Sequence, residues 1–352
     1  MRTLLYTEAI REALDLAMAA DQRVYVMGLG VPDPKAIFGT TAGLQAKYGP
    51  QRVFDMPVAE NGMTGVAIGS ALAGMRPVMV HQRVDFALLA LDQIANSAAK
   101  WSFLFAGKQS VPLVIRLLIG RGWGQGPQHS QSLQATFAHF PGLKVVMPTS
   151  PYDAKGMLLA AIADPNPVVF LEHRWLHSTF GHVPPEHYHA PLSQALVSRP
   201  GSDITLVASS LAHIEALQAA NILAQHNISA EVLDLRSIQP LDRETIHASL
   251  KKTKRLLVVD HGWKSFGVAG EIIASMSEIA FTDLISAPQR VTAPDHYPAT
   301  TPAHANLYYP GVAEIVNAAL HMFKRTPMSE SDMQLTIPLH RDVPDKNFRG
   351  PF

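Results

Sequence analysis

The sequence predicts an α/β protein of two domains, each built on a mostly parallel β-sheet with helices on its faces. Segments with strand and helix patterns alternate along most of the chain, which is typical of parallel sheets. The alternation stops once, in a stretch rich in Pro and His, and then restarts. The 352 residues suffice for two domains of ordinary size. We expect domains at 1–176 and 201–325, a linker at 177–200, and an extended tail without periodicity at 326–352.

Apolar periodicity and residue type predict the individual elements. The expected strands of the first domain are 23–29, 52–55, 76–82, 111–117, 144–147 and 167–172. Its expected helices are 7–20, 38–48, a glycine-rich helix after a turn at Glu60, 86–100, 132–138 and 151–163. In the second, smaller domain we expect strands at 203–209, 229–235, 255–260 and 290–293. The helices between and after them are expected at 212–226, 242–251, 266–279 and 311–323.

Composition excludes several classes of function. The net charge is +0 and only 16% of residues are charged, so the basic stripe of a nucleic-acid-binding protein is missing. No apolar run reaches the length of a membrane span, and the N-terminus lacks signal-peptide features. There is no cysteine, so we expect a cytoplasmic protein without disulfides. The 16 histidines show no zinc-ligand spacing. The low charge content suggests that part of the surface is buried against another subunit.

The stretch 52–74 combines a short strand, one acid and a helix without charges. Glu60 stands beside Asn61 and Gly62, and four glycines lie in or next to the following helix. Since glycine weakens a helix by about 1 kcal/mol relative to alanine, their number suggests that another helix or a ligand approaches closely. A carboxylate at the amino end of such a helix needs a partner. A lone buried Glu is more often structural than catalytic, but this context favours function.

Ligands of open parallel sheets bind at the carboxyl ends of the strands. This rule selects three loops of the first domain: the Glu60 turn, residues 81–83, and the glycine-rich loop 120–131, which carries His129. A Walker-type phosphate loop is excluded because no Lys-Ser/Thr follows the glycines. A mobile loop over a cleft is the simpler interpretation. His129 is as readily a structural loop histidine as a functional one, and Phe86 as readily a core aromatic.

Five ordered blocks of sequence carry a strong resemblance to one family. They are 55–62 (DMPVAENG), 91–100 (LDQIANSAAK), 126–131 (GPQHSQ), 141–148 (PGLKVVMP) and 152–156 (YDAKG), with 234–242 (DLRSIQPLD) in the second domain. They resemble the β subunit of the thiamine-diphosphate-dependent first component of 2-oxo acid dehydrogenase complexes, in its pyruvate and acetoin branches. The resemblance covers residues 4–323 and implies a pyrimidine-binding domain followed by a transketolase C-terminal-like domain.

The resemblance also implies residue roles. Glu60 would hydrogen-bond N1′ of the cofactor's aminopyrimidine and so support deprotonation of the thiazolium C2. Phe86 falls where the family has an aromatic near that ring, and Gln82 is a further cofactor-binding candidate. His129 falls where the family has a histidine associated with acyl transfer to a lipoyl group.

The resemblance further implies a binding loop for a structural monovalent cation. Ala161, Asp164 and Asn166 match a loop that holds such an ion, K⁺, in some members, mostly through backbone oxygens.

One motif of the family is missing: Gly-Asp-Gly with a later Asn, which binds Mg²⁺ and the cofactor's diphosphate. We therefore expect a separate α subunit to bind that end, in an α2β2 assembly that serves a lipoyl acyltransferase. The sequence departs from the family at Leu29-Gly30, at 81–85 and at 121–124, all near the expected site. Two alternatives stay open: a split transketolase-like or acyloin-forming enzyme with a non-lipoyl acceptor, and a non-catalytic scaffold.

Overall fold

The computed structural model describes residues 2–33, 35, 37–122, 124–335 and 341–343. Their contacts divide the chain into two compact units, which are described separately. The first contains residues up to 120 and 136–192, and the second contains 121–135 and 193–346. Residues 121–135, which the sequence places in the first domain, group with the second unit because their side chains and amides bond there. No helix among the described residues is long and apolar enough to cross a membrane.

The first unit is a parallel sheet with strand order β6-β7-β5-β4-β2-β3. Its strands are β2 (Val24–Gly28), β3 (Val53–Phe54), β4 (Arg76–His81), β5 (Val114–Ile119), β6 (Lys144–Val146) and β7 (Val168–His173). A small antiparallel sheet joins β1 (Thr3–Leu5) to β8 (Phe180–His182). The order confirms the predicted parallel α/β architecture and brings the carboxyl ends of β2, β3 and β4 to one edge.

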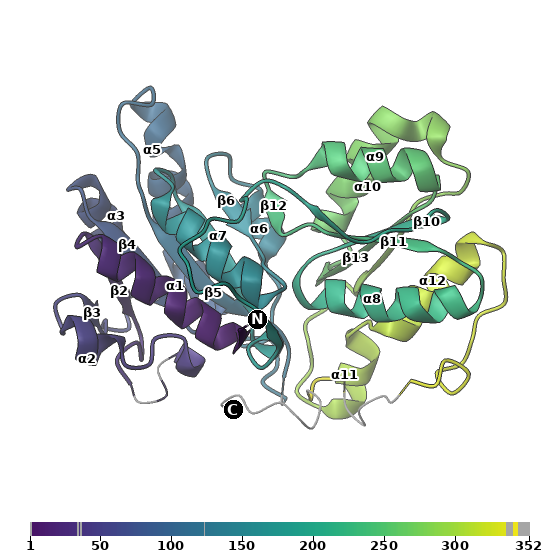
Figure 1. Cartoon of the computed structure of the whole chain (residues 1–352), viewed down its shortest axis with the longest axis horizontal. Coiled ribbons are helices and arrows are strands. Elements are labelled where there is room, and N and C mark those ends of the chain that lie inside the picture. The colour runs from purple at the N-terminus through teal and green to yellow at the C-terminus, as the bar shows by residue number, and fades with distance from the viewer. Residues whose placement is uncertain (1, 34, 36, 123, 336–340, 344–352) are drawn as a thin grey trace. The chain divides into compact units, whose positions relative to one another are not determined.

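Helices cover this sheet, and α1 packs along α7 (Figure 1). The helices are α1 (Tyr6–Ala20), α2 (Leu44–Tyr48), α3 (Glu60–Leu72), α4 (Val84–Ala87), α5 (Ala99–Leu104), α6 (Gln134–Ala138) and α7 (Pro151–Ala163). The apolar period of α1 buries Ile10, Leu14 and Met18, as the sequence predicts. Helix α7 starts at Pro151 because the Ser150 hydroxyl accepts a hydrogen bond from the Asp153 amide, 3.0 Å away.

The second unit is a five-stranded sheet with order β14-β13-β10-β11-β9, parallel except for β9. Helices α9 and α10 pack on one face, and α8 and α12 pack on the other (Figure 1). The strands of this sheet are β9 (Leu196–Arg199), β10 (Ile204–Ala208), β11 (Ala230–Asp234), β13 (Leu256–Trp263) and β14 (Gln289–Ala293). The short strand β12 (Ser237–Gln239) does not belong to it. The helices are α8 (Ser210–Gln225), α9 (Arg243–Thr253), α10 (Val268–Ala280), α11 (Pro302–Tyr308) and α12 (Val312–Met322).

Two predicted helices differ from the structure. The segment predicted as one helix at 38–48 is a 3₁₀ turn (Ile37–Gly39) followed by α2, because Gly39 and Gly43 take left-handed conformations with φ of 86° and 77°. The helix predicted at 86–100 contains a π-helical segment, Gln93–Ala98. A π turn rotates the helix face. Ile94, within this segment, is buried, while Leu88, which precedes it, is exposed.

The glycine-rich helix begins earlier than predicted. Glu60 is not in a turn before the helix but is the first residue of α3. A Cβ added at Gly62 or Gly69 would meet nothing within 4 Å, and one at Gly65 would meet only the Gln93 side chain, at 3.6 Å. The close neighbour that these glycines suggest is therefore not supplied by the described residues of this chain.

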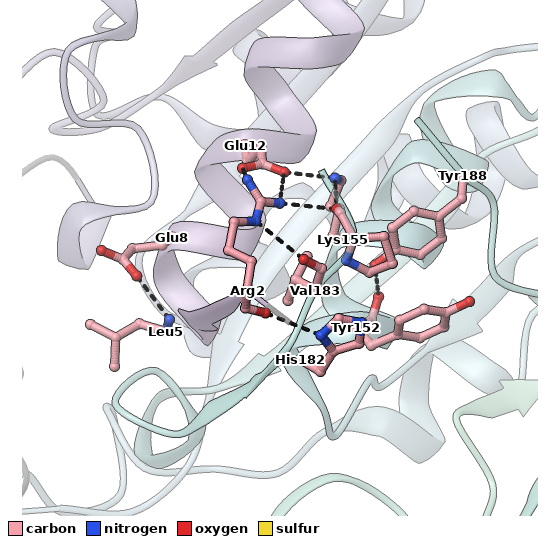
Figure 2. A network of polar contacts seen from close by, with 10 residues as sticks. Arg2, Leu5, Glu8, Glu12, Tyr152, Lys155, His182, Val183 and Tyr188 are labelled. Carbon is pink, nitrogen blue, oxygen red and sulfur yellow. Dashed lines mark hydrogen bonds and ion pairs between the residues drawn. The ribbon is translucent and has the colours of Figure 1, made fainter. Parts of the chain in front are cut away.

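A polar network anchors the N-terminal segment of the first unit (Figure 2). Arg2 makes a two-pronged ion pair with Glu12 on α1, at 2.9 and 2.7 Å. The fully buried Lys155 of α7 donates to Glu12 Oε1 and to the Pro184 carbonyl, both at 2.6 Å, and its ammonium lies 5.2 Å from the Tyr188 ring centroid. The lysine is therefore buried with its charge paired, which joins α1 and α7 to the chain that follows the sheet.

The segment after α12 packs back onto the second unit. Met333 is buried in that unit's core, and Met328 and Leu335 lie against the same cluster. Asn317 of α12 bonds to both the amide and the carbonyl of Met328. The tail predicted at 326–352 therefore makes core contacts over its first ten residues, and most of its remainder lies outside the described residues.

Candidate functional site

Glu60 is a buried acid at the amino end of a helix. It is 5% exposed, and its carboxylate makes no hydrogen bond or ion pair within the described ranges. Its backbone carbonyl accepts from the Thr64 hydroxyl at 2.7 Å, which fixes the first turn of α3. The positive end of the helix dipole favours the carboxylate. Its oxygens are not among the fully enclosed polar atoms that lack a partner, so a ligand can reach them. The site therefore fits a ligand that offers a hydrogen-bond donor to Glu60.

Three loops meet at the carboxyl edge beside this helix. The Gly30 amide, after β2, donates to Asp55 Oδ1, after β3, at 3.1 Å. Gln82, after β4, donates from Nε2 to the Leu29 carbonyl at 3.1 Å. Gly30 has φ of +71°, a conformation that favours glycine, and a Cβ there would lie 2.9 Å from Gln82 Nε2 and displace that side chain. These contacts hold Gln82 at the edge with its side chain exposed.

Phe86 belongs to α4, the short helix that follows β4, and its side chain is half-buried. Glu60, Gln82 and Phe86 thus follow the carboxyl ends of β3 and β4, the strands on either side of β2. This is the edge at which parallel sheets bind ligands. The sequence-based assignment of these residues to one site stays a prediction, and the topology is compatible with it.

In the segment 81–85, where the sequence departs from the family, a histidine and an arginine are buried. His81 and Arg83 are buried, whereas Gln82 between them is exposed. Burial lowers the pKa of His81 to about 4, so its ring is neutral at pH 7, and burial also lowers the pKa of Arg83. The Arg83 guanidinium lies 5.3 Å from the Phe38 ring centroid and donates to the Gln82 carbonyl at 2.7 Å. Sequence reasoning flagged this segment but assigned these two residues no role.

His129 lies in the second unit and is half-buried, on the glycine-rich loop 120–131. Its amide donates to the Gly126 carbonyl at 3.4 Å, and the next residue, Ser130, is buried. The assignment of the His129 loop and Glu60 to one ligand site stays a prediction, because the two residues lie in different units.

The loop predicted to hold a monovalent cation follows α7 and already contacts two basic side chains. Arg76 Nη1 donates to the Ile162 carbonyl at 2.7 Å and to the Asp164 carbonyl at 3.3 Å. The Asp164 carboxylate pairs with Lys144 and accepts from the Asn166 amide at 2.9 Å. Ala161 contributes its carbonyl to the end of the helix. An added K⁺ would compete with the Arg76 guanidinium for these carbonyls, so the loop fits such an ion poorly as it stands.

Metal-ligating side chains do not cluster elsewhere in the described chain. Among the residues that the structure describes, no group of three or more His, Cys, Asp or Glu side chains could hold a metal ion. The expected Mg²⁺ site on another subunit stays a prediction.

Comparisons with known proteins agree with this fold and topology. Residues 2–178 match the model of the transketolase pyrimidine-binding domain, and residues 193–315 match the transketolase C-terminal domain. A solved structure titled "Split gene transketolase, inactive beta4 tetramer" aligns with a TM-score of 0.74 at 22% identity, covering 91% of this chain and 98% of that one. At that identity the likeness concerns the fold alone. The two-domain α/β fold is therefore transketolase-like, as predicted.

Curated relatives narrow the family. The chain is 42% identical over 330 residues to "Pyruvate dehydrogenase E1 component subunit beta-2, mitochondrial" of Oryza sativa, covering 92% of this chain and 87% of the relative. It is 40% identical over 334 residues to "Acetoin:2,6-dichlorophenolindophenol oxidoreductase subunit beta" of Cupriavidus necator, covering 92% and 98%. The chain belongs to the family of β subunits of thiamine-diphosphate-dependent pyruvate dehydrogenase E1 components and acetoin oxidoreductases.

Proposed function

We propose that this chain is the β subunit of a 2-oxo acid dehydrogenase of the pyruvate or acetoin type. Together with an α subunit in an α2β2 assembly, it would decarboxylate a 2-oxo acid and pass the acyl group to the lipoyl domain of an acyltransferase. The observation that carries the proposal is Glu60, a buried carboxylate without a partner in the described chain, at the strand edge where this fold binds ligands. Cytoplasmic localisation is part of the proposal.

Glu60 fits one end of thiamine diphosphate, whose aminopyrimidine can donate to a carboxylate. When bound, the cofactor supplies the carbon nucleophile and electron sink that decarboxylation requires. Glu60 would hold the proton shared with N1′, in a buried setting where such a hydrogen bond is strong. Phe86 would offer its ring to the pyrimidine, and Gln82 would orient a polar group at the same edge. His129 would assist acyl transfer by exchanging a proton with the acceptor.

An α subunit is supported by two features of this chain. The sequence lacks the family's diphosphate–Mg²⁺ motif, so that end of the cofactor needs another protein. In addition, α3 presents glycines with open space at Gly62 and Gly69, and the neighbouring Val66 is 55% exposed. A helix with such a surface is suited to close packing against a partner.

Substituting Glu60→Gln tests the proposal. The amide keeps the size of the side chain but cannot hold the N1′ proton, so we expect 2-oxo acid oxidation with dichlorophenolindophenol to fall at least about 100-fold. Assembly with the α subunit, followed by size-exclusion chromatography, should be unchanged. Glu278→Gln, an exposed acid on α10, is the matched control and should be fully active. Normal turnover by the Glu60→Gln enzyme would refute the assignment.

A split transketolase-like or acyloin-forming enzyme is the second candidate, because the departures at 81–85 and 121–124 lie in loops expected near the substrate. Supplying a 2-oxo acid with either a lipoyl domain or an aldehyde separates the two candidates. Acyl transfer to the aldehyde alone would favour the second. Loss of all turnover in the wild-type assembly would favour a non-catalytic scaffold.

A further inference from the structure

The glycine-rich loop 120–131 is tied to the second unit at its start. Arg121 Nη2 donates to Glu215 Oε1 of α8 at 2.5 Å, and the guanidinium lies 5.0 Å from the Tyr309 ring centroid. The other oxygen of Glu215 lies 2.7 Å from His261 Nε2. Burial alone would raise the pKa of Glu215, but His261 and Arg121 outweigh it and lower that pKa. The acid is therefore ionised, and it fixes Arg121 at the base of the loop.

In the middle of the glycine-rich loop, the backbone at two glycines lies close to Thr300. Gly124 and Gly126 have φ of +66° and +67°. A Cβ at Gly124 would lie 2.8 Å from the Thr300 carbonyl oxygen, and one at Gly126 would lie 2.6 Å from Thr300 Cγ2. Both positions therefore require glycine for conformation and for space. Because glycine loses more backbone freedom on ordering than any other residue, this loop needs contacts from outside itself.

One such contact comes from the C-terminal tail. The Gly124 amide donates to Asp342 Oδ2 at 2.8 Å, although the two residues are 218 positions apart. Asp342 is 3% exposed, so this charge-assisted hydrogen bond is shielded from water. The acid was part of a tail to which the sequence assigned no role.

Arg341 anchors this acid. Its backbone amide donates to Asn306 Oδ1 at 2.7 Å, and its Nη1 donates to the Tyr309 carbonyl at 2.9 Å. The same guanidinium pairs with Glu314 and Glu330, each at 2.8 Å. Tyr309 thus contacts both Arg121, through its ring, and Arg341, through its carbonyl. We call Arg341 and Asp342 the C-terminal clamp.

We propose that the C-terminal clamp is a positioning device that fixes the glycine-rich loop and thereby presents His129 to the acyl acceptor. His129 lies five residues after Gly124, and its amide closes a turn onto the Gly126 carbonyl, so its position depends on the glycines that the clamp and Thr300 hold. The part of the inference that concerns acyl transfer rests on the proposed role of His129. The part that concerns the order of the loop stands on the contacts alone.

Hydrogen exchange tests the structural part in the assembled protein. Asp342→Ala removes the acceptor of the Gly124 amide, and we expect exchange in the loop peptide to accelerate about 10- to 100-fold, as for a lost hydrogen bond to a charged group. Asp342→Asn keeps an acceptor oxygen and should restore most of the protection. Asp332→Ala is the matched control, since the carboxylate of that exposed acid accepts from the amide and hydroxyl of Ser329 and, among the described residues, does not contact the loop. Unchanged loop exchange in Asp342→Ala, or an equal change in Asp332→Ala, overturns the clamp.

The functional part is tested on the same variants. We expect Asp342→Ala to slow acyl transfer to a lipoyl domain about 10-fold, to leave oxidation by dichlorophenolindophenol unchanged, and to recover in Asp342→Asn. If Asp342→Ala shows faster hydrogen exchange in the loop but normal acyl transfer, the positioning role is overturned, although the hydrogen bond from Gly124 to Asp342 is upheld. A His129→Ala reference enzyme that transfers normally would instead refute the proposed role of His129, and the exchange result would still decide whether the clamp exists.

Discussion

Replacing Arg116 by Met should strongly destabilise the first unit. Arg116 on β5 is fully buried, and its Nε and Nη2 donate to the two carboxylate oxygens of Glu172 on β7, at 2.6 and 2.9 Å. Nη2 also donates to the Thr40 hydroxyl at 3.0 Å. Burial alone would raise the pKa of Glu172, but Arg116 and then His177 outweigh it and lower that pKa to about 2. The pair is therefore ionised inside the sheet.

The magnitude follows from what the substitution leaves behind. Methionine fills much of the volume of the arginine, but Glu172 stays at 0% exposure, and His177 Nε2 lies 3.4 Å from its carboxylate. Removing one member of a buried ion pair costs about 3–5 kcal/mol. Replacing both members by apolar side chains removes the unpaired charge, so Arg116→Met with Glu172→Leu should lie within about 1 kcal/mol of the wild type.

Native-state hydrogen exchange of β5 and β7 measures this cost directly. A loss of about 4 kcal/mol corresponds to roughly 1,000-fold faster exchange of the most protected amides. Circular dichroism verifies that the variant remains folded. The reasoning would be refuted by a change below about 1 kcal/mol in the single variant, or by a double variant as unstable as the single one.

Two further predictions concern a histidine and two glycines. His81 has a folded-state pKa of about 4 against an ordinary value of 6.5, so its stabilising contribution is present above pH 6.5 and is lost as the pH falls towards 4, by about 1.4 kcal/mol per pH unit. Exchange in β4, measured against pH, should flatten over this range in His81→Leu, and an equal slope in the variant would contradict the assignment. Gly142→Ala should cost several kcal/mol, since its Cβ would lie 2.0 Å from the Ala99 carbonyl. Gly74→Ala, with almost the same φ and open space around it, should cost about 1 kcal/mol. Thermal unfolding compares the two variants. Equal decreases in melting temperature would show that the space around the glycine does not determine the cost of the substitution.

The sequence predicted the elements that depend on local patterning. Apolar periodicity located α1, and β-branched runs located β2, β4 and β7, because burial on both faces of a parallel sheet leaves an unmistakable apolar pattern. Elements without such a pattern were missed. The edge strand β9, with its mostly exposed side chains, lies in the stretch predicted as a linker.

The residues of the candidate site that belong to sequence motifs could be predicted from the sequence. Strand ends and the resemblance selected Glu60, Gln82 and Phe86. In the structure Glu60 follows β3, and Gln82 and Phe86 follow β4, which is a strand of the same sheet. The partners of Arg116 and Asp342 were not predictable, since they lie far away in the sequence or on another strand. No local rule records a pairing that forms only on folding.

By itself, the sequence determined the two-domain α/β fold, the family, and the identity of the buried acid, because these depend on periodicity and on motifs of adjacent residues. The tertiary structure alone decided that Glu60 starts its helix without a partner in the described chain. It also decided that two cationic side chains contact the proposed cation loop, and that a tail acid holds the glycine-rich loop. Each of these depends on the distance between groups from separate parts of the chain, and packing sets that distance.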